Sequence, residues 1–221
     1  MKLRRVAAFA VGASLFLSPN VFAAGPTPQI TDPSGDANMT ANAQNDVVTP
    51  AGSQDWADVT SVLWQTVKTR GRVTAFTVTA TLKGAPTPPA PASLVFRMLG
   101  TTAKCPFFGV AYYTEQSSDA TLPQSAIRDN CIDTTTRLTK IDLPVIKDNT
   151  ITWTVPLDKI PADTGVKVGT TLTGLYFTVN EIEDFHGGCI PDNPVLAGPT
   201  CGLGTGVWDN STAGDASFSI K

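Results

Sequence analysis

The chain alternates between short hydrophobic stretches and clusters of turn-forming residues. The clearest alternation covers residues 72–82, where alternate residues from Phe76 to Leu82 are apolar and threonines fill most of the positions between them. A period of two with β-branched residues is typical of a half-buried strand. Shorter stretches of the same kind predict six further strands, at residues 58–67, 93–99, 107–113, 151–155, 172–179 and 216–220.

Signals for helices are scarce. The proline-rich stretch 84–92 is typical of an extended surface loop, because each of its flanks has a strand pattern. Residues 156–165 predict one short helical turn, limited by a proline on each side. Many short strands without alternating helices predict an all-β fold, an antiparallel β-sandwich of the jelly-roll or immunoglobulin-like type, with a partly closed β-barrel as the alternative.

The first 23 residues have the pattern of a secretory signal peptide. Basic residues at the start precede an apolar run from Val6 to Leu17, and Val21-Phe22-Ala23 supplies a small-x-small cleavage site. We therefore expect a protein secreted to the extracellular space or the periplasm, with one β-sandwich domain over residues 24–221 and no membrane span. The oligomeric state stays open.

Cysteine usage agrees with an exported protein. The chain has four cysteines, at positions 105, 131, 189 and 201, which allow three pairings. Pairing between sequence neighbours predicts one disulfide between Cys105 and Cys131 and another between Cys189 and Cys201. Each would stabilise the fold by about 3 kcal/mol through loop closure. A zinc site is disfavoured, because the sequence has one histidine and no C-x-x-C pair.

Charge is distributed unevenly along the chain. The formal net charge is −3, and residues 24–67 contain five aspartates and no lysine or arginine. Residues 168–220 contain six acidic residues and again no basic one. A chain of this kind lacks the basic patch that nucleic-acid binding needs, so we expect no nucleic-acid partner.

The strongest chemical signal is the sequence D-P-S-G-D at residues 32–36. Proline and glycine favour a tight turn, which lets the carboxylates of Asp32 and Asp36 point into one concavity. Calcium takes six to eight oxygen ligands from carboxylates and from the carbonyls of such turns. Asp55 and Asp58, at the entry to the next strand, are further candidate ligands. If the first and last strands lie close together, Asp32, Asp36 and Asp58 would meet near Asp209 or Asp215; the alternative is a solvated turn.

Four short motifs occur in an order that resembles a known group of modules. They are D-P-S-G-D near the mature N terminus, D-W-A-D-V-T-S-V at a strand start, W-T-V-P-L-D-K-I late in the chain and the closing D-A-S-F-S-I-K. This layout is similar to secreted bacterial β-sandwich modules that are stabilised by calcium, namely carbohydrate-binding and DOMON-like modules. The resemblance implies calcium ligation by Asp32, Asp36 and Asp58, with Asp55 as a weaker candidate, and it implies no catalytic residue.

A second acidic group follows an apolar strand, in N-E-I-E-D-F-H-G-G-C at residues 180–189. It combines Glu181, Glu183 and Asp184 with the only histidine, His186. Paired carboxylates can serve acid–base hydrolysis, so a small extracellular hydrolase is the alternative function. Neighbours within one loop rarely achieve the separation that a glycosidase needs, and the mature chain has no G-x-S-x-G nucleophile motif.

Aromatic residues are the remaining candidates for ligand contact. Trp153 shares a strand face with apolar neighbours, so we expect it in the core. Trp56 and Trp208 lie beside acidic residues in loop-like stretches, and of the adjacent Tyr112 and Tyr113 one must face outward if both lie on a strand. We therefore take Trp56, Trp208 and Tyr113 as ligand-binding candidates.

Together these patterns predict a secreted, non-catalytic binding or surface-interaction module with a structural calcium site. The expected partner is an extracellular ligand, either a glycan or an envelope component. A hydrolase using the Glu181 to His186 loop and a purely structural envelope protein are the alternatives.

Overall fold

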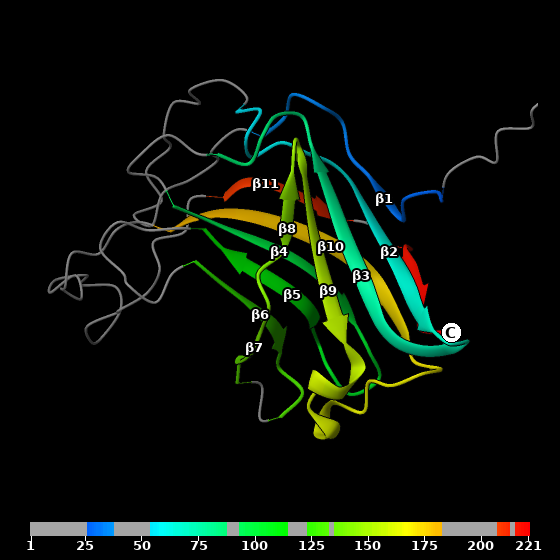
Figure 1. Ribbon diagram of the computed structural model, residues 1–221. Coiled ribbons are helices and arrows are strands. Elements are labelled where there is room, and N and C mark those ends of the chain that lie inside the picture. Colours follow the sequence, from blue (N-terminus) through cyan, green and yellow to red (C-terminus); the bar gives the residue numbers. More distant parts are fainter. Residues whose placement is uncertain are drawn as a thin grey trace, which may run out of the picture.

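A computed structural model describes residues 26–37, 54–87, 93–114, 123–132, 135–182, 207–212 and 215–221 of the chain. In these residues two antiparallel sheets pack face to face (Figure 1). The fold is therefore the predicted β-sandwich, and the alternative of a partly closed barrel is wrong. Among the described residues no helix is both long and apolar enough to cross a membrane.

The first sheet has five strands in the order β1-β2-β3-β9-β8. Their bounds are Ile30–Thr31 for β1, Val59–Thr69 for β2, Arg72–Leu82 for β3, Thr150–Pro156 for β9 and Val145–Lys147 for β8. Strands β2 and β3 form a hairpin whose two turn residues, Arg70 and Gly71, both have positive φ. That conformation matches the right-handed twist of the strands it joins.

The second sheet runs in the order β11-β10-β4-β5-β6-β7, and β12 pairs with β10. The bounds are Ser93–Thr101 for β4, Phe108–Tyr113 for β5, Gln124–Asp129 for β6, Arg137–Ile141 for β7, Thr171–Ile182 for β10, Val207–Thr212 for β11 and Ser217–Ser219 for β12. Strand β12 pairs with residues 171–173 of β10, and β11 pairs with residues 176–180. The last two strands therefore lie end to end along one edge of β10.

The predicted strands agree with those observed. Residues 72–82 match β3 at both ends, and the other six predicted stretches coincide with β2, β4, β5, β9, β10 and β12 to within three residues at each end. The short strands β1, β6, β7, β8 and β11 were not predicted. The single predicted helical turn is two short 3-10 helices, η1 (Leu157–Lys159) and η2 (Ala162–Thr164).

The core lies between the sheets and is rich in aromatic side chains. Trp64, Phe76 and Phe218 form a triad with ring centroids 5.7 to 5.8 Å apart, which joins β2 and β3 to β12. Such pairs stabilise a core by about 0.5 to 1.5 kcal/mol beyond the area they bury. Trp153 is also fully buried, which confirms its predicted place in the core.

One disulfide, between Cys105 and Cys131, links the segment before β5 to the segment after β6. This confirms the first of the two predicted pairs. Cys189 and Cys201 lie outside the described residues, as do residues 1–23.

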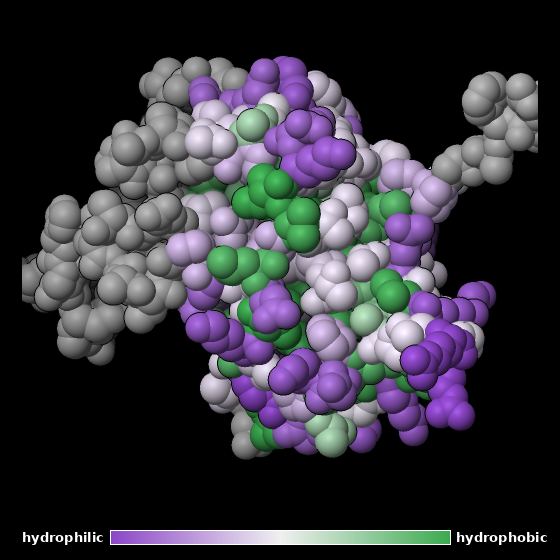
Figure 2. Space-filling view, in the orientation of Figure 1, coloured by the Kyte–Doolittle hydropathy of each residue, from purple (hydrophilic) through white to green (hydrophobic). Residues whose placement is uncertain are grey.

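At the far edge of the first sheet, β8 leaves apolar side chains exposed. Val145 is 68% and Ile146 is 45% exposed, and Figure 2 shows hydrophobic surface over this part of the molecule. Lys147 ends the strand and is exposed too. A charged residue on a short edge strand is a common protection against edge-to-edge association.

Gly109 in β5 leaves no room for a side chain. A Cβ atom there would lie 2.0 Å from the backbone oxygen of Met98 in β4. We expect Gly109→Ala to separate β4 from β5 locally and to lower the free energy of unfolding by about 1 to 3 kcal/mol, as overpacking does. Chemical denaturation measures the effect, with Gly169→Ala as a comparison in which the positive φ strains the added side chain but the space around it is open. Equal, small losses in both variants would contradict the close approach.

Candidate metal site

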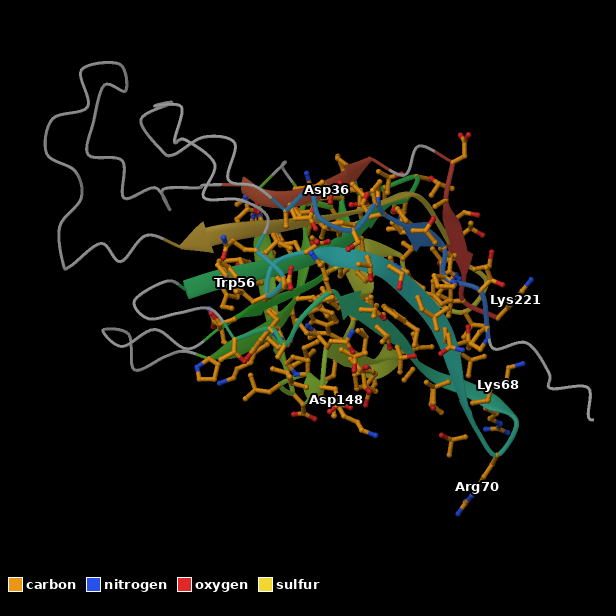
Figure 3. The ribbon with its side chains drawn as sticks, turned by 90° about the horizontal axis from the view of Figure 1, so that it is seen from above. Asp36, Trp56, Lys68, Arg70, Asp148 and Lys221 are labelled. Carbon is orange, nitrogen blue, oxygen red and sulfur yellow. A yellow bond between two sulfur atoms is a disulfide. The ribbon has the colours of Figure 1, made fainter. Side chains whose placement is uncertain are left out.

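Three carboxylates from separate parts of the chain meet at one end of the sandwich. Asp32 follows β1, Asp36 lies in the turn after it and Asp209 lies in β11, and carboxylate oxygens of all three lie within 4.8 Å of one another. Figure 3 shows Asp36 beside β11. The expected meeting of the N-terminal turn with an acidic residue near the end of the chain is confirmed for Asp209.

The local sequence explains the turn that positions Asp32 and Asp36. Pro33 fixes one backbone angle, and Gly35 has a φ of 99°, a conformation that favours glycine. The Gly35 N–H donates a hydrogen bond of 2.5 Å to Oδ2 of Asp58. Asp58 itself is fully buried just before β2. Asp58, a predicted calcium ligand, therefore stabilises the turn through this hydrogen bond to the backbone.

Asp209 connects the two sheets. It lies in β11 of the second sheet and is only 4% exposed. Its Oδ2 accepts a hydrogen bond of 2.7 Å from the backbone N–H of Val59, the first residue of β2 in the first sheet. The acidic site thus forms where the edges of the two sheets meet.

Burial and mutual repulsion raise the pKa of two of these carboxyls. Burial, followed by the charges of Asp36 and Asp58, raises the pKa of Asp32 to about 6. Burial is also the largest cause for Asp209, whose pKa rises to about 7 although the hydrogen bond from Val59 opposes the shift. In addition, Oδ2 of Asp32 is buried without a hydrogen-bond partner in the described part of the chain. Such a group favours protons or a cation in its neighbourhood.

Two other acidic candidates lie apart from this group. Asp55 forms an ion pair of 2.8 Å with Lys83, and its side chain is 57% exposed. Asp215 is exposed in the turn before β12. The structure does not bring either residue into the group formed by Asp32, Asp36 and Asp209.

The described aromatic candidates do not form an exposed platform. Trp56 is half-buried against the core, and its indole N–H donates a hydrogen bond of 3.2 Å to Gln54. Tyr112 belongs to the main core, whereas Tyr113 packs with Val95 and Ala111 in a separate cluster and is 6% exposed. The adjacent tyrosines thus belong to different clusters, but neither is exposed, so the expectation that one of them faces outward into solvent is wrong. Trp208 lies in β11, next to Asp209.

The residues of the alternative catalytic group fall mostly beyond the described ranges. Glu181 lies near the end of β10. Glu183, Asp184 and His186 lie outside the described residues.

Comparison with known proteins found no matching family model, no matching curated protein and no matching solved structure. The likeness to calcium-stabilised modules therefore stays a prediction from sequence.

Proposed function

We propose that the protein is a secreted, non-catalytic binding or surface-interaction module stabilised by a calcium ion. The observation that supports this proposal is the meeting of Asp32, Asp36 and Asp209 within 4.8 Å. Three carboxylates at this separation repel one another unless a proton or a cation compensates their charge. Among the described residues no lysine or arginine forms an ion pair with Asp32 or Asp209.

The chemistry of these donors fits a hard cation. Calcium prefers carboxylate and carbonyl oxygens, and the three side chains would supply the carboxylates while the turn at residues 32–36 offers carbonyls. The buried, unpartnered Oδ2 of Asp32 is the kind of atom that an ion would satisfy. When bound, calcium would supply positive charge that joins the N-terminal segment to β11. Its role here is structural, and the expected ligand of the module is an extracellular glycan or envelope component.

Calcium should raise the melting temperature of the mature protein. At a hundredfold excess over Kd, binding to the folded state alone adds about 2.7 kcal/mol. For a domain of roughly 200 residues this corresponds to about 5 to 10 °C. The measurement is a thermal melt in millimolar calcium against the same protein in chelator.

The matched variants are Asp36→Ala and Asp55→Ala. We expect Asp36→Ala to remove the calcium shift and Asp55→Ala, which removes a carboxylate outside the group that pairs with Lys83, to keep it. Identical wild-type melts in calcium and in chelator would mean that D-P-S-G-D is only a turn. A calcium shift that survives in Asp36→Ala would place the ion elsewhere.

A further inference from the structure

Strand β2 has an open edge toward its C-terminal end, beyond Trp64. One side pairs with β3 from end to end. On the other side β1 pairs with Ser61 and Val62, and the backbone N–H groups of Asp32 and Gln29 donate hydrogen bonds to the carbonyls of Thr60 and Val62. Beyond β1, the side chain of Gln29 takes the place of a strand residue. Its Oε1 accepts a hydrogen bond of 2.7 Å from the N–H of Trp64, and its Nε2 donates one of 3.1 Å to the Trp64 carbonyl.

The next position along this edge is Thr66. In an extended strand the N–H and C=O groups of every second residue point to the same side. Because β2 has no bulge between Trp64 and Thr66, the backbone groups of Thr66 point to the same side as those that bind Gln29. On this side of Thr66 no strand among the described residues pairs with β2, whereas β3 pairs with it on the other side. Pro28 and Pro26, the residues before Gln29, have no N–H to donate, so the preceding chain is unsuited to continue β1.

A groove of about 510 Å³ runs beside this open edge. Its other wall is β12, which pairs with β10 on its opposite side. The two walls are close together, since the backbone N–H of Lys221 donates a hydrogen bond of 3.4 Å to the Thr66 hydroxyl. The indole N–H of Trp64, a lining residue, is buried without a hydrogen-bond partner in the described part of the chain.

The lining of the groove carries one charged side chain, which is positive. Lys221 lines it, and none of its lining residues is an aspartate or glutamate. Figure 3 shows Lys68 at the same end of the molecule as Lys221, with Arg70 at the tip of the β2–β3 hairpin beyond. This end is therefore complementary to negative charge and lies away from the acidic group that contains Asp36.

We propose that this groove binds an extended, acidic segment of a partner polypeptide, which adds as a strand to the open edge of β2. The Thr66 N–H and C=O would supply main-chain hydrogen bonds, and Lys221 and Lys68 would attract acidic side chains of the segment. Strand addition takes its affinity from main-chain hydrogen bonds and its selectivity from side chains on alternate positions. The inference does not depend on the calcium site.

A glycan fits the groove less well. Sugar recognition by stacking needs an exposed aromatic face, whereas Trp64 is 1% and Phe218 6% exposed. An unpaired strand edge, by contrast, presents regularly spaced donors and acceptors to an extended backbone.

The test uses the mature protein and a fluorescently labelled ten-residue peptide of alternating valine and glutamate, measured by fluorescence anisotropy at about 50 mM salt. We expect saturable binding, weakened about fivefold by Lys221→Glu, since a rim charge chiefly sets attraction and selectivity. Thr66→Pro, which removes the N–H facing the groove, should weaken binding about tenfold. The matched control is Lys147→Glu on β8, the opposite edge of the same sheet, which should bind like the wild type.

Three further probes decide between strand addition and other modes. The same peptide with its central amides N-methylated should bind at least tenfold more weakly, because it has lost its main-chain donors. A peptide of alternating valine and lysine should also bind more weakly. Equal binding of the N-methylated peptide, no saturable binding at all, or equal losses in Lys221→Glu and Lys147→Glu would overturn the proposal. Binding of a neutral oligosaccharide that is lost in Thr66→Pro, without peptide binding, would assign the groove to a glycan instead.

Discussion

Replacing Arg137 with alanine should lower the free energy of unfolding by about 3 to 5 kcal/mol, the usual cost of leaving a buried charge without its partner. Arg137 in β7 forms two hydrogen bonds of 3.0 Å with Asp129 in β6 and two of 2.8 Å with Asp163 in η2. The side chain of Asp129 is 1% exposed. Loss of the guanidinium therefore leaves a carboxylate in the interior with little solvent to compensate it.

This contact also fixes the end of the sandwich that carries the disulfide. Asp129 accepts a further hydrogen bond of 3.3 Å from the N–H of Cys131, whose sulfur is joined to Cys105. The hydrogen bonds with Arg137 lower the pKa of Asp163. A lowered pKa means that the contribution of Asp163 is present at neutral pH and is lost on acidification below its ordinary value.

Chemical denaturation at neutral pH measures the loss, with Lys140→Ala as the control. Lys140 is an exposed residue of the same strand, so its removal changes the net charge equally and should cost less than about 0.5 kcal/mol. Arg137→Lys should be intermediate, because an ammonium group lacks the fork that contacts two carboxylates at once. Adding Asp129→Asn to Arg137→Ala should recover part of the loss. A loss below 1 kcal/mol in Arg137→Ala would indicate that water reaches Asp129.

The sequence predicted those strands in which one face is apolar or the apolar run is long. Strand β3 alternates from Phe76 to Leu82, which is enough to predict the strand, although the neighbours Ala75 and Phe76 are both buried. The hexapeptide of β6 buries both Ala126 and Ile127, which are neighbours, and so has no period of two. Strand β11 contains Asp209 and Asn210, residues that usually favour turns. Its pairing with β10 stabilises a segment that propensity alone would place in a loop.

The acidic site was predictable only in part, for a similar reason. Asp32 and Asp36 are brought together by a local turn, which proline and glycine encode. The choice between Asp209 and Asp215 depends on which part of the last segment lies beside the N terminus, and that is decided by the pairing of β11 with β10. The groove beside β2 was missed, because no sequence pattern shows that the side chain of Gln29 occupies the place of a strand.

Asp209→Asn should stabilise the protein in chelator and destabilise it in calcium. In the wild type the pKa of Asp209 is raised from 3.8 to about 7, chiefly by burial. A raised pKa means that the folded state holds the proton more tightly than the unfolded state. The stabilisation that this provides is complete below about pH 4 and is lost as the pH rises through 7. In chelator the wild-type melting temperature should therefore decrease as the pH rises from about 5 to about 8.

Asparagine has the same shape without the charge, and its side-chain oxygen can still accept the hydrogen bond from Val59. We therefore expect Asp209→Asn to melt several degrees above the wild type in chelator at about pH 8, with a weaker pH dependence that reflects Asp32. In millimolar calcium the order should reverse, because the ion compensates three carboxylates in the wild type and has lost one of its ligands in the variant.

The measurement is the melting temperature of both proteins as a function of pH, once in chelator and once in calcium. Asp215→Asn is the control, since it removes an equal charge at an exposed position in the next turn. It should follow the wild type in both conditions. If Asp209→Asn melts below the wild type in chelator at every pH, the charge of Asp209 is not a cost to the folded state, and the repulsion that motivates the calcium site is absent.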